Sequence, residues 1–398
     1  MSTILVNGPV ICFRLEGKIG NVDKVIYLFG DRHVNVDAQT ECESYKSIDF
    51  VKYFVKTMKK TDKTKYYDLF FEVGSKEAEP WVNKYKLKYI HEFTKYFKQT
   101  INIVNNPDDK RQKTKNIGSK DEPNLLLHHI DIREYFYAPF IVPYSDSLQN
   151  IINNRIFNPL DITQSEVDAL KNTLDILKTN LIKTTSLLLG EKAEIPNDDL
   201  HIKIKNISNK ILDGYNNKQV KDILLNKTPL LNIIREMRTD VINEFENLMK
   251  IAHEFNELLD KNYNKFYKGK NFYEYGVDRV TKNKYCSKIM ITGEKINTML
   301  LDIYVFIMDL YFLRRFLDKD YITNAVAYTG YLHTFNYLFV MVKYFGFKIT
   351  HCTNSGAKIS EIESTIKKNE YDENIMACYM PEEFQQCIDM SSFPPKFE

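Results

Sequence analysis

The sequence predicts an α/β fold: a central sheet with flanking helices, built from one βαβ unit near each end of the chain and interrupted by a large all-helical insertion. Apolar strand-like runs alternate with helical spacing over residues 10–132. Helical spacing then continues almost without a break over residues 145–317, and the alternation of strand and helix returns at residues 321–350. A chain that leaves a sheet and returns to complete it is expected when an α/β domain carries an insertion.

The first unit opens with a predicted hairpin. Val10–Leu15 and Val25–Phe29 are rich in β-branched and aromatic residues, and glycine and asparagine between them supply the turn. Ser44–Lys60 has apolar residues at helical spacing, with Ser44 as its N-cap, and Tyr66–Val73 is again a strand. A strand, a helix and a strand in this order form a right-handed crossover, so the two strands should be parallel and end at one edge of the sheet.

Polar residues stand where these two strands end. The stretch Lys24–His33 finishes in Asp31, Arg32 and His33, and Glu72 finishes the second strand. In an open α/β sheet, ligands and catalytic groups collect at the carboxyl ends of the strands. We therefore expect Glu72 near His33, in an active site at this edge.

The first unit continues with a predicted helix from Pro80 to about Val104, a turn-rich loop at Asn105–Asp121 and a strand at Asn124–Ile132. This strand brings further polar residues to the same edge: His128, His129, Asp131 and Arg133. The two histidines point to opposite faces, so only one can reach the site. Asp131 and Arg133 share a face, where they either bind substrate or form a salt bridge.

Three long periodic runs make up the insertion: Asp161–Leu189, Pro229–Phe266 and Thr281–Leu317. Two of them would extend ~55 Å as straight helices, so we expect an antiparallel pair or a kink. The most apolar stretch, Ile296–Leu313, contains Asp302 and Asp309, which would be costly in lipid. We therefore expect a buried helix without a membrane span, whose two aspartates contact a cap or a lysine more often than a metal.

The second unit repeats the order of the first. Tyr321–Tyr328 is a predicted strand, Gly330–His333 a turn, Thr334–Phe345 a helix and Phe347–Thr350 the last strand. The remaining tail is polar and carries at most short helices. We expect an N-terminal α/β half at residues 1–143, a helical insertion or cap at 144–318, a C-terminal half completing the sheet at 319–352, and the tail at 353–398.

Composition excludes several classes of protein. Lysine and arginine (55) nearly balance aspartate and glutamate (53), so a net charge of +2 indicates no nucleic-acid surface. The cysteines show no CxxC pairing, and without a secretory signal we expect reduced thiols in an intracellular protein: Cys12, Cys42, Cys286, Cys352, Cys378 and Cys387. The excess of lysine over arginine, with much asparagine and isoleucine, is typical of AT-rich genes such as those of large DNA viruses and some protists.

Two Gly-x-x-His motifs, Gly30 to His33 and Gly330 to His333, flank a strand that ends in Glu72. In this order they resemble the TIKI/TraB, erythromycin esterase and ChaN-like superfamily, over roughly residues 24–134 and 310–350. The resemblance implies an active site of His33, Glu72 and His333, with the two glycines in the turns. It also implies a helper residue before the second motif: Arg314, Arg315 or Asn324.

Two imidazoles and one carboxylate also have an expected chemistry of their own. With an open position, His33, Glu72 and His333 suit a divalent ion such as Zn, Mn, Co or Fe, which would activate a bound water. Without metal, a histidine polarised by a carboxylate is a general base for water. We expect hydrolysis of an ester or amide in a small molecule or peptide, assisted by Asp31 and Arg315. The residues expected to bind substrate are Arg32, Asp131, Arg133 and Asn324.

Two other functions stay open. Asp31 and His33 are similar to the Asp-x-His opening of calcineurin-like metallophosphoesterases, although the Gly-Asp-x-x-Asp and Asn-His motifs are absent downstream. A degenerate, non-catalytic structural or host-interaction protein of a large DNA virus would keep the sheet only for its fold. In that case Glu72 would pair with Arg32 or Arg133, and His333 would be buried among aromatic residues.

Overall fold

The computed structural model describes residues 3–72, 88–100, 102–103, 117–118, 124–157, 164–192, 199–268, 279–372, 379–381 and 384–398. The predicted helix start at Pro80 and most of the predicted loop Asn105–Asp121 lie outside these residues. The chain forms two compact units. The first comprises Met1–Ile132, Tyr215–Pro229 and Met308–Glu398, and the second comprises Arg133–Gly214 and Leu230–Ile307.

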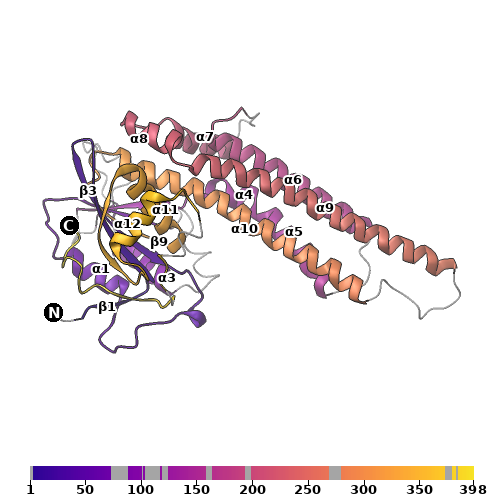
Figure 1. Ribbon diagram of the computed structural model, residues 1–398, viewed down its shortest axis with the longest axis horizontal. Helices are drawn as coiled ribbons and strands as arrows, with labels where there is room; N and C mark the ends of the chain where they lie inside the picture. The colour runs from indigo at the N-terminus through magenta and orange to yellow at the C-terminus, as the bar shows by residue number, and fades with distance from the viewer. Residues whose placement is uncertain are drawn as a thin grey trace. The chain divides into compact units, whose positions relative to one another are not determined.

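A six-stranded sheet forms the centre of the first unit (Figure 1). Its order is β10 (Lys348–Thr353), β2 (Ile11–Ile19), β3 (Val22–Asp31), β9 (Asn324–Gly330), β5 (Tyr67–Phe71) and β8 (Leu125–His129). β2 is antiparallel to both neighbours, as the predicted hairpin requires for β3, whereas β3, β9, β5 and β8 are parallel. The α/β class and the return of the chain to complete the sheet are confirmed.

The position of β9 decides the geometry of the strand ends. β9 lies between β3 and β5, so the strand contributed by the C-terminal unit separates the two strands of the N-terminal unit. Gly330 is in register with Asp31 across the β3–β9 pair, and Tyr328 is in register with Phe71 across the β5–β9 pair. Both Gly-x-x-His motifs and the end of β5 therefore meet at one edge of the sheet.

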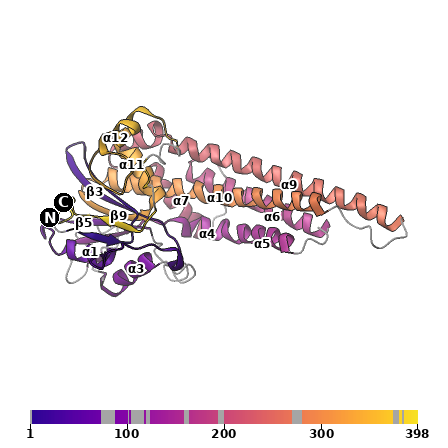
Figure 2. The same ribbon diagram turned by 60° about the horizontal axis from the view of Figure 1, so that its bottom comes forward.

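Helices cover both faces of this sheet. α1 (Phe50–Met58) and α3 (Lys88–Thr100) pack on one face, where Phe50, Phe54 and Phe93 join a buried aromatic core. α11 (Tyr331–Phe345) and α12 (Ile359–Lys368) lie on the other side (Figure 2). A strand covered on both faces is apolar at almost every position, which explains the continuous apolar run of β3.

A buried lysine ties β3 to the end of α10 (Arg279–Asp318). The Lys24 ammonium donates to the carbonyl oxygens of Phe316, Lys319 and Ile322 at 2.9, 2.7 and 2.5 Å. Carbonyls at a helix C-terminus lack partners within the helix and carry partial negative charge, so a cation stabilises them. Burial lowers the pKa of Lys24 to about 8, although Asp68, Asp320 and Asp318 oppose this shift.

Several predicted boundaries need correction. The first helix begins at Phe50, after β4 (Ile48–Asp49), with Asp49 and not Ser44 at its N-cap. Gly330–His333 is not a turn, because Gly330 ends β9 and is itself the N-cap of α11. The tail contains a helix of ten residues, α12, and a strand, β11 (Cys387–Asp389). β11 pairs antiparallel with β1 (Leu5–Asn7), which pairs in turn with β4.

The expectation of reduced thiols is wrong for two cysteines. Cys42 and Cys387 form a disulfide across a sequence separation of 345 residues. Cys12 and Cys352 are free, and the side chains of Cys286 and Cys378 lie outside the described residues. No short cysteine spacing could reveal this bond, because β1 and β11 bring the two residues together only in the folded chain.

The second unit consists of helices. Its main members are α5 (Val142–Phe157), α6 (Gln164–Leu188), α7 (Asp199–Leu212), α9 (Leu230–Lys268) and α10 up to Ile307. The minor elements of the chain are η1 (Val36–Ala38), β6 (Asn102–Ile103), β7 (Ile117–Gly118), η2 (Arg133–Tyr135), α4 (Tyr137–Phe140), α8 (Lys218–Asp222) and η3 (Ile223–Lys227). Among the described residues, one helical segment, Ser287–Asp318, is long and apolar enough to cross a membrane, and 67% of its apolar window is buried, as in the core helix of a soluble protein.

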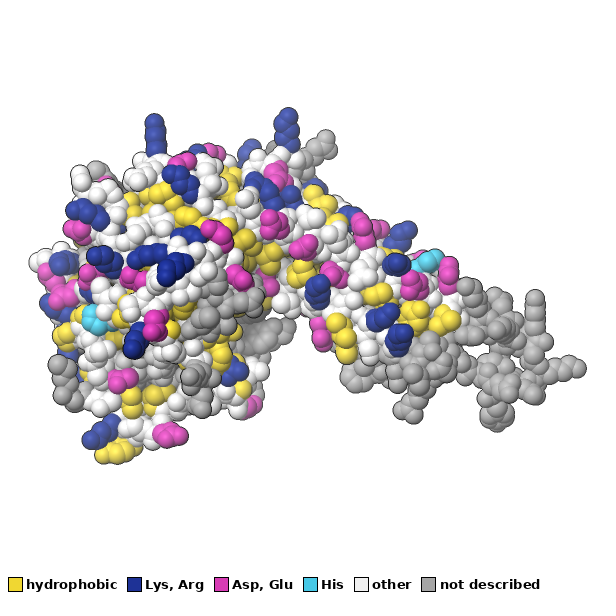
Figure 3. Space-filling view, in the orientation of Figure 1, with side chains coloured by type: hydrophobic (Ala, Val, Ile, Leu, Met, Phe, Trp, Pro, Cys, Tyr) yellow, Lys and Arg dark blue, Asp and Glu magenta, His cyan; other side chains and the backbone are white. Residues whose placement is uncertain are grey.

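The visible surface mixes basic and acidic side chains, as the near balance of charges in the sequence requires. Figure 3 shows lysine, arginine, aspartate and glutamate side chains interspersed over the face it presents. The expectation that the protein binds no nucleic acid stays a prediction.

Candidate functional site

The three residues that the Gly-x-x-His pattern singled out converge at the carboxyl edge of the sheet. His33 Nε2 lies 3.2 Å from Glu72 Oε2, and His333 Nε2 lies 3.4 Å from Glu72 Oε1. His33 follows β3, Glu72 follows β5, and His333 stands in the first turn of α11, which begins where β9 ends. One carboxylate therefore faces two imidazoles, one on each oxygen.

His33 has a carboxylate beside each of its ring nitrogens. Its Nδ1 lies 3.2 Å from Asp31 Oδ2, while its Nε2 faces Glu72. Asp31 is fixed in turn, because its Oδ1 accepts from the Arg32 amide at 2.8 Å and from Gln386 Nε2 at 3.2 Å. His33 has a φ of 53°, in the left-handed region that non-glycine residues rarely adopt. A strained backbone held by such contacts is a feature often found at functional sites.

His333 has a matching aspartate that sequence reasoning did not assign to the site. Its Nδ1 lies 2.5 Å from Asp309 Oδ1, and Asn336 Nδ2 donates to Asp309 Oδ2 at 2.5 Å. The Tyr371 hydroxyl donates to Asn336 Oδ1 at 2.7 Å. Asp309 was expected to contact a cap or a lysine. The sequence did carry one signal for this contact. Asp309 lies in the most apolar predicted helix, where a carboxylate is expected to be buried and therefore to need a polar partner.

Glu72 is the centre of this chain of contacts. Besides the two imidazoles, its Oε2 accepts from the Gly330 amide at 2.6 Å. That amide stands at the N-terminus of α11, where unpaired N–H groups and the helix dipole favour a negative charge. We define the site chain as Asp31, His33, Glu72, His333 and Asp309.

Proton affinities in the site chain are set by its alternating charges. Burial lowers the pKa of His33, but Glu72 and Asp31 outweigh it and raise that pKa to about 10. Burial also lowers the pKa of His333, and Asp309 and Glu72 raise it to about 9. Burial raises the pKa of Glu72, but His333 and His33 hold it well below its usual range. At neutral pH both histidines are therefore protonated and Glu72 is ionised.

Only one member of the site chain is open to solvent. The side chain of His33 is 24% exposed, whereas those of the other four members are 6% exposed or less. His33 is therefore the member of the site chain that solvent can reach, and the other four are buried behind it.

Gly330 leaves the space that His33 occupies. A Cβ at this position would stand 3.2 Å from His33 Cδ2 and 3.3 Å from its Nε2, closer than nearly all such contacts. Gly330→Ala is therefore expected to displace the imidazole and lower any activity that depends on His33 about tenfold or more, without unfolding the protein. Gly356→Ala, whose Cβ would meet a backbone oxygen at an ordinary 3.4 Å, is the control. Equal rates for both variants, measured beside their thermal melts, would contradict this geometry.

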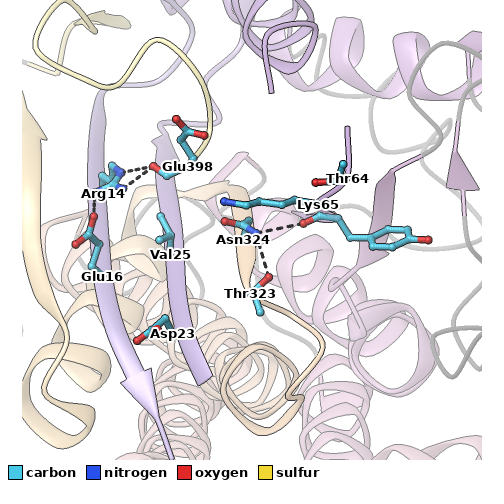
Figure 4. A pocket seen from close by; sticks show the side chains of 10 residues that line it. Arg14, Glu16, Asp23, Val25, Thr64, Lys65, Thr323, Asn324 and Glu398 are labelled. Atoms are coloured by element: carbon cyan, nitrogen blue, oxygen red, sulfur yellow. Dashed lines mark hydrogen bonds and ion pairs between the residues drawn. The ribbon is translucent and has the colours of Figure 1, made fainter. Parts of the chain in front are cut away.

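Three predicted helper residues lie elsewhere. Asn324 begins β9, roughly 20 Å along the strand from Gly330. It lines a pocket at the amino ends of the strands with Arg14, Lys65 and Glu398 (Figure 4). Arg314 and Arg315 follow Asp309 on α10 by more than one turn, and their guanidinium groups lie over the rings of Tyr215 and Tyr321 at 5.8 Å. The direction of β9 and α10 carries all three away from the site chain.

Arg32 lies next to the site chain, whereas His128 of β8 pairs outside it. Arg32 is exposed beside His33, with its guanidinium 5.6 Å from the ring centre of Phe384, so a substrate contact stays a prediction. His128 is buried, where Nε2 binds Asp68 Oδ1 at 2.7 Å. This forms a second imidazole–carboxylate pair outside the site chain. Asp131 is half-buried beyond the end of β8, and Arg133 belongs to the second unit.

The donor atoms of the site chain are arranged for hydrogen bonding. Within the part of the chain that the structure describes, no group of three or more His, Cys, Asp or Glu side chains is placed to hold a metal ion. The two oxygens of Glu72 face different imidazoles, and one of them also accepts from the Gly330 amide. Binding of Zn, Mn or Co by the predicted ligands His33, Glu72 and His333 stays an untested prediction.

Comparison with known proteins places the chain among viral sequences. A family model described as "Family of unknown function (DUF5847)" matches residues 4–398. Uncharacterized protein R706 of Acanthamoeba polyphaga mimivirus is 33% identical, covering 99% of this chain and 97% of its own length. Uncharacterized protein R160 of the same virus is 31% identical, covering 98% and 97%. No solved structure matches. These relatives support a viral origin, while the resemblance to the TIKI/TraB and erythromycin esterase superfamily stays a prediction.

Proposed function

Since the chain belongs to the DUF5847 family, whose description assigns no activity, we propose its function from the site chain: hydrolysis of an ester or amide bond in a small molecule or peptide. One observation carries the proposal. Two imidazoles face opposite oxygens of one buried carboxylate, and each has an aspartate oxygen within 3.2 Å of Nδ1. An imidazole oriented by a carboxylate at Nδ1 is the arrangement that general-base catalysis requires.

His33 is the general base in this proposal, because it is the exposed member of the site chain. In this proposal Nε2 of neutral His33 turns from Glu72 Oε2 to the water and takes its proton, while the water oxygen forms a bond to the carbonyl carbon. The proton then passes to the leaving oxygen or nitrogen as its bond to that carbon breaks. Asp31 and Glu72 stabilise the imidazolium that forms between these steps. His333, oriented by Asp309, holds Glu72 in place and is a positioning residue.

The proposal sets the pH dependence of the reaction. His33 must lose its proton before it can accept one from water, and its pKa is raised to about 10. The rate is therefore expected to rise about tenfold per pH unit from pH 7 until it levels off near that pKa. A rate that falls over this range would instead assign His33⁺ the role of general acid.

His33→Ala tests the base directly. The wild-type protein and the variant would be assayed with aryl esters, a peptide amide and a phosphodiester between pH 7 and 10. We expect turnover of an ester or amide that His33→Ala lowers by about 10²–10⁴. His351→Ala is the matched control, because His351 is half-buried on β10 and binds Thr350 outside the site chain. Equal rates in the wild-type protein and His33→Ala would overturn the proposal.

The same panel separates the alternative functions. Turnover of the phosphodiester alone, dependent on added Mn, Zn or Co, would favour the calcineurin-like phosphoesterase, in which Asp31 and His33 bind metal. A chelator is expected to leave ester hydrolysis unchanged if His33 acts as a base without metal. Turnover of none of the substrates would favour a non-catalytic structural or host-interaction protein of a virus.

A further inference from the structure

We propose that the Cys42–Cys387 disulfide is a redox switch that controls the site chain by fixing Gln386 on Asp31. The bond joins the segment that follows His33 to strand β11 in the C-terminal tail. Its effect on rate rests on the proposed hydrolase function, whereas its effect on the structure around Asp31 does not.

A short path of contacts connects the disulfide to His33. Gln386 precedes Cys387, and its Nε2 donates to Asp31 Oδ1 at 3.2 Å. The other oxygen of Asp31 lies 3.2 Å from His33 Nδ1. The disulfide is thus one residue away from the side chain that fixes Asp31, which in turn orients the imidazole.

Gln386 is buried, and one of its side-chain polar atoms makes no hydrogen bond among the described residues. Its side chain is 1% exposed, and Nε2 also donates to the Gly8 carbonyl at 3.2 Å. Its Oε1 is buried without a hydrogen-bond partner among the described residues. A buried acceptor without a partner costs free energy, so Gln386 gains by moving toward water unless other bonds hold it. The adjacent disulfide is such a bond, and it acts together with backbone hydrogen bonds that join Gln386 to Thr40 and Gly8.

Non-covalent contacts would keep the tail close after reduction. The backbone amide of Gln386 donates to the Thr40 carbonyl at 2.9 Å, and the backbone amide of Cys42 donates to Asn7 Oδ1 at 2.9 Å. Ile388 is fully buried in the core of the first unit. Reduction should therefore loosen the segment around Gln386 without releasing β11, as a reversible switch requires.

The disulfide is open to exchange. Cys42 and Cys387 are both partly exposed, so a thiolate can reach them. A dithiol reductant attacks one sulfur, forms a mixed disulfide and releases the other cysteine as a thiol. Its second thiol then displaces the remaining cysteine. Two electrons and two protons pass to Cys42 and Cys387, and the dithiol leaves as a disulfide.

The test compares the oxidised and dithiothreitol-reduced full chain, with thiol counting by mass spectrometry. We expect reduction to lower the rate at least fivefold and to increase hydrogen exchange in a peptide that covers Asp31–His33. Reoxidation should restore both. Cys42→Ser should behave like the reduced protein, and Cys352→Ser, which removes a free thiol, should keep the full response.

Gln386→Ala separates this switch from a general effect on stability. With the disulfide intact, this variant should already show the low rate and the faster exchange at Asp31–His33, and reduction should change neither further. An equal response to reduction in Gln386→Ala and the wild-type protein would overturn the route through Gln386. An unchanged exchange rate at Asp31–His33 on complete reduction would overturn the switch, even if no substrate is turned over. Two free thiols at Cys42 and Cys387 in protein purified without reductant would overturn it as well.

Discussion

Glu72→Gln is expected to lower the plateau rate of ester or amide hydrolysis, where His33 is neutral in both proteins, about a thousandfold while the protein stays folded. Glutamine keeps the shape of the side chain and can still accept the Gly330 amide. It loses the charge that both imidazoles share, and its amide group turns a donor toward one of them. His33 then loses much of the interaction that stabilises its protonated form during the reaction.

The pH profile shows whether Glu72 acts through charge. Since Glu72 raises the pKa of His33, the rising limb of the Glu72→Gln profile should move to lower pH. Steady-state rates and circular dichroism of the variant would be compared with those of Glu363→Gln, whose carboxylate accepts the Ile349 amide outside the site chain. A lower rate with an unmoved pH profile would mean that Glu72 only supports the fold.

Local sequence patterns predicted which residues meet at the strand ends better than they predicted the strand order and the residues that contact them. Two Gly-x-x-His spacings and a glutamate at a strand end were enough to select His33, Glu72 and His333. They did not show that β9 lies between β3 and β5, which is what places Gly330 beside Asp31. Sheet order depends on how strands from distant parts of the chain pack together, and adjacent residues carry little of that information.

The missed and misplaced residues have one cause in common. Asp309 reaches His333 because α10 packs against α11, and Gln386 reaches Asp31 because β11 pairs with β1. Both contacts depend on tertiary packing between distant segments. Arg315 and Asn324 stand near the second motif in the sequence, yet α10 and β9 carry them away from it. Proximity in the chain is therefore a poor guide to which polar groups assist a site built on strand ends.

Asp309→Asn is expected to cost more folding free energy at pH 7 than at pH 10, and the difference between the two costs is on the order of 1 kcal/mol because Glu72 still faces His333. Asp309 and Glu72 raise the pKa of His333 from 6.5 to about 9 in the folded protein. A raised histidine pKa contributes stability that is fully present below pH 6.5 and is lost as the pH rises through about 9. Removing the Asp309 charge should therefore remove most of this stability at pH 7. At pH 10 little of this stability is present, so little can be lost.

The unfolding free energy of Asp309→Asn is subtracted from that of the wild-type protein at each pH, so that groups unaffected by the substitution cancel. Lys24 titrates in the opposite sense, because its pKa is lowered to about 8 and its contribution to stability rises with pH. Its effect is the same in both proteins, so it cancels in the difference between their urea unfolding free energies. Asp23→Asn, which changes an exposed partner of Lys18, should give equal differences at the two pH values. A cost of Asp309→Asn that is the same at pH 7 and pH 10 would mean that His333 is neutral in the folded protein, and that Asp309 binds it as an uncharged imidazole.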